Sequence, residues 1–150
     1  MARLLALVLW ASLALAGDPG AGARIVGGTV AGLASRPKGR IDLTPPDSMV
    51  FRHGGDGEVR IAFDRVHTLE YGQRVSRRYA EAILISPVLL LAKSRKHFLT
   101  VGYTDGEGRR QALVFQVDKG DVRAVLAGLE AKTGRRVEYQ DDEARKTGGG

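Results

Sequence analysis

The sequence predicts a mainly β domain that ends in one amphipathic helix, and two observations support this fold class. Between 96 and 117, apolar and polar residues alternate in two runs separated by an Asp-Gly turn, which is the pattern of a β-hairpin, and from 118 the apolar spacing becomes helical. Upstream, between 25 and 72, several short alternating runs are each bounded by turn residues. Such a series favours two packed antiparallel sheets or a barrel over a parallel sheet.

Five short strands are expected in the first half of the domain. Alternation places every second side chain on one face, as with Val59, Ile61 and Phe63 in the fourth run. Turn residues separate the runs, because proline, aspartate and glycine favour the tight backbone geometry of turns. The expected strands are 25–33, 40–44, 48–53, 58–63 and 66–72.

A hairpin followed by a helix is expected at 96–134. The helix is indicated by an i, i+3, i+4, i+7 stripe in which we expect Leu126 to be the most buried residue. Asp118 is expected to cap the first turn, and Gly134 to end the helix in the left-handed conformation. The stripe consists of Val122, Val125, Leu126 and Leu129, and a short extended segment is expected after it at 136–139.

An apolar insert at 73–96 interrupts the β pattern. Its apolar run, 79–92, contains Ser86-Pro87, a pair that favours the start of a short helix through Lys93. Two interpretations stay open: the apolar side chains fill the core or cover a sheet edge, or part of the run dips into a bilayer with flanking cations at anionic headgroups. The cations that would contact a membrane or another anion are Arg74, Arg77, Arg78, Lys93, Arg95 and Lys96.

The two ends of the chain are expected to lie outside the folded domain. Residues 1–16 have the positive start, apolar middle and Ala-x-Ala end of a secretory signal, so we expect export to a periplasm or the medium after cleavage at Ala16. The alternative is an uncleaved anchor. A flexible leader is expected at 17–24, the β domain at 25–139 and a disordered, charged and glycine-rich tail at 140–150. The sequence contains no cysteine, so packing alone must stabilise the domain.

No catalytic, cofactor-binding or metal-binding residue is predicted. The segment 24–28 resembles the activation site of trypsin-like proteases, but too few residues follow it and the chain has no Gly-Asp-Ser-Gly-Gly segment. His53, His67 and His97 do not have the spacing of metal ligands. The glycines at 54–57 and 106–108 do not continue into a phosphate loop.

The formal net charge is +6, which fits contact with an anionic surface. Nucleic acid is not expected as a partner, because the basic residues are not interleaved with aromatic residues that could stack on bases. The partner class therefore stays open between a protein and a lipid surface.

The order of strands, basic-flanked insert, hairpin and final helix resembles the pleckstrin-homology-like (PH-like) fold of bacterial exported proteins of unknown function. The stretches that carry the resemblance are 61–71, 96–106 and 122–134. It implies a barrel of two packed sheets closed by a C-terminal helix, and it implies binding of lipids, peptides or proteins rather than catalysis. Lipid-binding members carry a basic loop between the first two strands, where this chain has Arg36, Lys38 and Arg40.

The sequence thus leads to three hypotheses. The first is an exported, non-enzymatic binding or scaffolding module. The second is a peripheral membrane module that uses the basic-flanked insert at 74–96. The third is an enzyme whose site the motifs above do not reveal, since one fold can host many functions.

Overall fold

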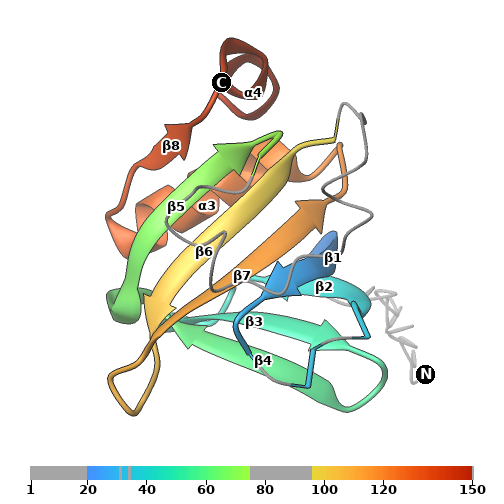
Figure 1. Ribbon diagram of the computed structural model, residues 1–150, viewed down its shortest axis with the longest axis vertical. Coiled ribbons are helices and arrows are strands. Elements are labelled where there is room, and N and C mark those ends of the chain that lie inside the picture. The colour runs from blue at the N-terminus through green and yellow to red at the C-terminus, as the bar shows by residue number, and fades with distance from the viewer. Residues whose placement is uncertain (1–19, 31, 34, 75–95, 150) are drawn as a thin grey trace, which may run out of the picture.

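The computed structural model describes residues 20–30, 32–33, 35–74 and 96–149. It confirms a mainly β chain, whose described strands form one eight-stranded sheet (Figure 1). Neighbouring strands are antiparallel except for the last pair, β5 and β8, which is parallel. In sheet order the strands are β4 (Gly57–Ala62), β3 (Ser48–His53), β2 (Lys38–Asp42), β1 (Ala21–Gly28), β7 (Arg110–Val117), β6 (Phe98–Thr104), β5 (Val66–Gly72) and β8 (Val137–Tyr139).

The sheet is open, whereas the sequence predicted a barrel or two packed sheets. Strands β4 and β8 stand at its two edges and do not pair with each other. Figure 1 shows β2, β3 and β4 crossing below β5, β6 and β7 at a steep angle, so that a single bent sheet wraps around the core. Two helices are present among the described residues rather than the one expected after the hairpin: α3 (Val122–Thr133) and α4 (Asp142–Gly148).

The core lies between the inner face of this bent sheet and the apolar stripe of α3. Phe51 of β3 and Phe115 of β7 are both fully buried and pack edge to face, with ring centroids 5.4 Å apart. The four stripe residues of α3 are buried as predicted. Leu129, at 0 % exposure, is more buried than Leu126 at 2 %, so the expectation that Leu126 is the most buried is wrong.

Helix α3 ends where the sequence predicted but begins later. Gly134 has a φ of 68° and its N–H donates to the carbonyl of Glu130, which confirms the left-handed stop. Asp118 does not cap the helix, because the residue before Val122 is Asp121, which itself makes no side-chain cap hydrogen bond. The Asp121 carboxylate instead accepts a 2.9 Å hydrogen bond from the backbone N–H of Gly22. Tertiary pairing with the N-terminal strand therefore takes the place of local capping.

The first strand also differs from the expectation. It spans Ala21–Gly28 rather than 25–33, so it begins inside the stretch for which a flexible leader was expected. The small residues that suggested a leader lie between two strands: Ala21 pairs with Ile41 of β2, and Ala23 pairs with Val117 of β7. Strands β3 and β5 have the bounds that were expected, and a 3₁₀ turn, η1 (Phe63–Arg65), joins β4 to β5.

The C-terminal segment is folded where a disordered tail was expected. The Asp141 side chain accepts a 2.6 Å hydrogen bond from the backbone N–H of Ala144, which caps α4. Ala144 is fully buried. A Cβ added at Gly148 would lie only 2.6 Å from Leu126, so α4 packs directly on the stripe of α3. Small residues at these two positions let a charged segment dock closely.

The apolar run at 79–92 lies outside the described residues, and so does the expected signal at 1–16. Neither interpretation of the insert is therefore decided by the fold. Within the described ranges, no helix is both long enough and apolar enough to cross a bilayer.

Candidate functional site

Four cations share the outer face of β1, β2 and β3. Arg24 of β1 lies directly opposite Lys38 of β2, and Arg40 of β2 lies directly opposite Arg52 of β3. Directly opposite residues in a sheet project to the same face, and residues two apart on one strand do so as well. All four side chains are exposed, whereas the neighbours Ile25, Ile41 and Phe51 point inward and are buried. We call Arg24, Lys38, Arg40 and Arg52 the basic face.

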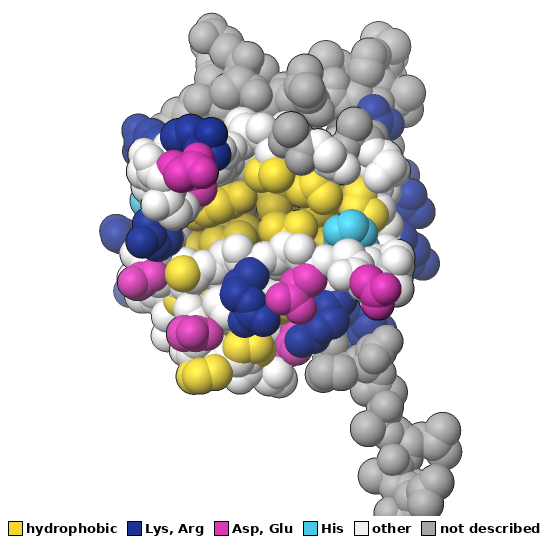
Figure 2. All heavy atoms as spheres, turned by 90° about the horizontal axis from the view of Figure 1, so that it is seen from below, with side chains coloured by type: hydrophobic (Ala, Val, Ile, Leu, Met, Phe, Trp, Pro, Cys, Tyr) yellow, Lys and Arg dark blue, Asp and Glu magenta, His cyan; other side chains and the backbone are white. Residues whose placement is uncertain are grey.

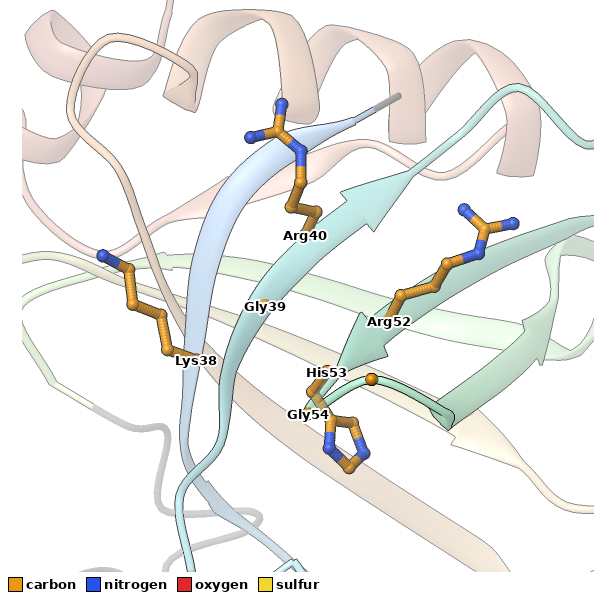
Figure 3. A pocket seen from close by; sticks show the side chains of 7 residues that line it. Lys38, Gly39, Arg40, Arg52, His53 and Gly54 are labelled. Atoms are coloured by element: carbon orange, nitrogen blue, oxygen red, sulfur yellow. The ribbon is translucent and has the colours of Figure 1, made fainter. Parts of the chain in front are cut away.

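A shallow cleft of about 360 Å³ lies at the end of this face. Figure 3 shows Arg40 and Arg52 rising to the same side from adjacent strands, while the His53 ring lies on the other side, beside the Gly54 turn. Between them, a Cβ at Gly39 would lie 2.0 Å from the carbonyl oxygen of Arg52. A side chain at Gly39 would therefore collide with the backbone of β3, so only glycine fits between Lys38 and Arg40. The lining residues are Lys38, Gly39, Arg40, Arg52, His53, Gly54 and Gly55.

One buried carboxylate on the same face of β2 orients Arg52. Asp42 is 2 % exposed, and its Oδ2 accepts a 2.6 Å hydrogen bond from Nη1 of Arg52. Burial by itself raises the pKa of Asp42, but hydrogen bonds from Thr44 and Arg52 outweigh this effect and lower the pKa to about 2. Asp42 is therefore ionised at neutral pH and fixes the orientation of the Arg52 guanidinium.

The other three cations of the face have weaker compensation. Arg40 donates to the backbone carbonyl of Gly20, which orients its guanidinium but brings no negative charge. Among the ion pairs between described residues, none involves Arg24, Lys38 or Arg40. Like charges directly opposite each other on neighbouring strands are destabilising. Arg24 and Lys38 form such a like-charged pair, whereas the Arg52 guanidinium opposite Arg40 is compensated by Asp42 and by Glu58, whose Oε2 lies 3.8 Å from Nε of Arg52.

The cations predicted around the insert are only partly described. Arg74 and Lys96 are exposed, and Arg77, Arg78, Lys93 and Arg95 lie outside the described ranges. The backbone N–H of Arg74 donates to Oε1 of Gln140 over 3.2 Å, next to a cleft of about 340 Å³. Lys96 lines a different cleft, of about 440 Å³, near the start of α3. Glu143 lines both clefts, so the clefts beside Arg74 and Lys96 adjoin each other.

Of the three cations noted between the first two strands, two belong to the basic face. Lys38 and Arg40 lie on β2, whereas Arg36 precedes the strand, with a φ of 52° in the left-handed region. Arg24 and Arg52 were not predicted from the sequence. Arg24 was assigned to the leader, and the alternation of 48–53 would have placed Arg52 opposite the buried face of its strand.

The three histidines are separated in the fold and occupy packed positions. His53 stacks on Phe51 with a centroid distance of 5.7 Å, and His97 stacks on Tyr71 at 5.5 Å. Nδ1 of His67 lies 3.0 Å from the Thr68 hydroxyl. In the part of the chain that is described, no three His, Asp or Glu side chains are grouped so that they could hold a metal ion.

Comparison with known proteins adds no assignment to this geometry, since neither a family model nor a curated protein matches the chain. What the basic face can do chemically follows from its donors. Guanidinium groups present paired N–H donors that match the oxygens of carboxylates and phosphates, and an ammonium group adds a mobile point charge. The face is therefore suited to holding an anionic partner by several contacts at once.

Proposed function

We propose that this chain is an exported, non-enzymatic binding module with a PH-like fold and that its basic face binds an acidic segment of a partner protein. The PH-like part of the proposal is supported by the order of the elements. Seven successive strands are joined to antiparallel neighbours, and a helix then packs its apolar stripe on the core. The export part is supported by the signal-like composition of residues 1–16.

The observation that carries the binding proposal is the position of four exposed cations on one face of three neighbouring strands. Arg24 stands opposite Lys38, and Arg40 stands opposite Arg52. Residues two apart on a strand are about 6.8 Å apart, and an extended acidic segment repeats its own side chains at the same interval. A segment lying along β2 can therefore present one carboxylate to Lys38 and the next to Arg40. A compact small anion would reach only one of these pairs.

The test is fluorescence anisotropy of a labelled peptide in which glutamate alternates with serine, titrated with the full chain at low salt. We expect binding that weakens as salt is raised, because exposed charges are screened beyond about 10 Å at 0.1 M salt. The variant Arg24→Gln/Arg40→Gln should bind at least tenfold more weakly. A lysine–serine peptide of equal length should not bind.

The matched control removes two exposed cations elsewhere, Lys119→Gln/Arg136→Gln, and so has the same net charge as the test variant. Circular dichroism should show that both variants stay folded. The proposal is wrong if the control loses as much affinity as the test variant, because the peptide would then respond to net charge alone. It is also wrong if the wild type ignores the acidic peptide at low salt.

The membrane-binding hypothesis remains a second candidate, favoured by the exposure of Arg74 and Lys96 at the two ends of the insert. Sedimentation with vesicles of phosphatidylcholine and phosphatidylglycerol separates it from the first. A membrane module should lose vesicle binding in Arg74→Gln/Lys96→Gln and keep it in Arg24→Gln/Arg40→Gln. If the basic face binds an acidic segment, the peptide titration should instead lose affinity in Arg24→Gln/Arg40→Gln and keep it in Arg74→Gln/Lys96→Gln.

A further inference from the structure

One edge of the sheet has no partner among the described strands. β4 pairs with β3 along one side only, in an unbroken antiparallel register from Ser48 opposite Ala62 to His53 opposite Gly57. The other edge strand, β8, has only three residues and contacts α4. Natural proteins protect exposed edges with proline, bulges or very short strands. β4 has six residues, no proline and no irregularity in its register.

The charges on β4 are arranged symmetrically. Glu58 and Arg60 are exposed and flank Val59, which is partly exposed and packs against the core. When two copies of an edge strand meet, a single charged residue repels its own copy and blocks pairing. Here the arrangement has the reverse effect. Antiparallel pairing centred on Val59 sets Glu58 of each copy opposite Arg60 of the other, so two opposite-charge pairs form by symmetry.

We propose that β4 is a self-association edge, which pairs antiparallel with β4 of a second copy of this chain around Val59. The pairing joins two eight-stranded sheets across a two-fold axis. On the outer face it forms two Glu58–Arg60 cross-strand pairs. On the inner face Val59 meets Val59 of the second copy, which removes both side chains from water.

The surroundings of β4 favour such pairing. Glu58 Oε1 lies 2.9 Å from Nη2 of Arg60 in the same chain, and each side chain also contacts β3: Nη1 of Arg60 donates to the Ser48 hydroxyl, and Glu58 Oε2 lies 3.8 Å from Nε of Arg52. Pairing at the edge replaces the Glu58–Arg60 contact within each chain by two such contacts between the chains. Ile61 would face Gly57 of the second copy, and the smallest residue leaves room for a large one. Figure 2 views the molecule from the side on which β4 lies and shows hydrophobic side chains in a hollow bordered by charged ones. Burial of Val59, which is partly exposed, adds to the backbone hydrogen bonds of the pairing.

The basic face uses Arg24, Lys38, Arg40 and Arg52 and the edge uses β4, and the two adjoin where Glu58 Oε2 lies 3.8 Å from Nε of Arg52. The Arg60→Glu variant disrupts the edge and keeps Glu58 beside Arg52, so it separates the two proposals. The two can therefore fail separately. A variant that disrupts the edge keeps all four cations of the basic face, and the peptide titration reports on that face in the monomer.

The experiment is analytical ultracentrifugation of the full chain over a range of concentrations. The wild type should show a monomer–dimer equilibrium. Glu58→Arg alone and Arg60→Glu alone each place like charges opposite one another in the pair, and each should weaken the dimer by roughly tenfold or more. The charge swap Glu58→Arg/Arg60→Glu restores opposite charges and should restore the dimer.

The decisive sample is the mixture of the two single variants. In antiparallel register around Val59, every charged position of one variant faces an opposite charge of the other. The mixture should therefore form a heterodimer that neither variant forms with itself. Asp64→Arg, an exposed acidic residue just outside β4, controls for net charge and should leave the dimer unchanged.

Three outcomes would overturn the inference. The first is a wild type that stays monomeric at every concentration, which would leave the edge open for a different partner. The second is a dimer that none of the charge variants weakens. The third is a mixture that behaves as the sum of its components, since this excludes the antiparallel register. Thermal unfolding of each variant shows that it is folded, so that loss of dimer reports on the edge.

Discussion

Replacing Leu126 by alanine tests whether α3 and α4 are packed as described. Leu126 is 2 % exposed, and its Cδ1 lies close to Gly148 of α4. The change removes three carbons from the core, a transfer loss of roughly 2 kcal/mol at about 0.8 kcal/mol per buried CH₂. The cavity adds to this, because α4 must move before the site can collapse, so we expect a total loss of about 3–4 kcal/mol.

Urea unfolding followed by circular dichroism measures this loss. At an m-value of about 2 kcal/mol/M the midpoint should fall by roughly 1.5–2 M. Arg123→Ala is the control on the same helix. The Arg123 side chain is exposed and donates a 3.2 Å hydrogen bond to the carbonyl of Lys146, so its loss should cost under about 1 kcal/mol. Equal losses for the two variants would refute the assigned helix phase.

Two further predictions concern the strands that carry the basic face. Asp42→Asn should lower the free energy of unfolding at pH 7 by about 2 kcal/mol, because the folded-state pKa of Asp42, about 2, lies below the ordinary value of 3.8 for an aspartate. Because the pKa of Asp42 is lower in the folded state than in the unfolded state, the wild type should keep this stabilisation above about pH 4 and lose it as the pH falls through about 2. The variant should have a flatter pH dependence there, measured by urea unfolding at each pH. Gly39→Ala should destabilise by about 1–3 kcal/mol, since its Cβ would lie 2.0 Å from the carbonyl oxygen of Arg52. An Ala variant as stable as the wild type in thermal unfolding would contradict that close approach.

Strands with clear local alternation could be predicted from the sequence, and so could the helix stop at Gly134. β3 and β5 have the expected bounds because each alternating run is closed by turn residues. β1 could not be bounded in this way, since a run of glycine and alanine looks like a linker until its two neighbouring strands are known. Helix α4 was missed for a related reason. Its stability rests on the burial of Ala144 against distant residues, and its charged sequence gives no sign of that contact.

Whether the sheet closes depends on the twist and register of eight strands together, and local alternation does not report either. The pairing of β5 with β8 illustrates this point. Val137 lies opposite Leu69 in parallel, so the segment after α3 occupies the edge of β5. A three-residue strand has too few residues for a period-2 signal to reveal its partner. The expectation of two packed sheets therefore placed β3 and β5 correctly and β1 incorrectly, and it did not predict the open sheet.

Only two of the four residues of the basic face were noted in the sequence as neighbouring cations. Lys38 and Arg40 are two residues apart, so alternation alone places them on one face. Arg52 could have been added from the hairpin that joins β2 to β3, since the register of a hairpin follows from its turn. Arg24 could not, because its place opposite Lys38 depends on where β1 begins. To predict a site formed by cross-strand pairs, one must know the register of the strands as well as the residues on them.

Pairing at β4 would also change what the basic face can bind. In the sheet order, β3 and β4 lie beside β2 and β1, so a second copy joined at β4 continues the same outer face. The two basic faces then lie on one surface, separated by the paired Glu58 and Arg60 side chains. An acidic segment long enough to span both would bind its second face as an intramolecular step, at a high effective concentration. A segment too short to reach both faces would bind the dimer no more tightly than the monomer. Self-association would therefore convert a weak electrostatic contact into selection for long or paired acidic segments, without any new residue in either face.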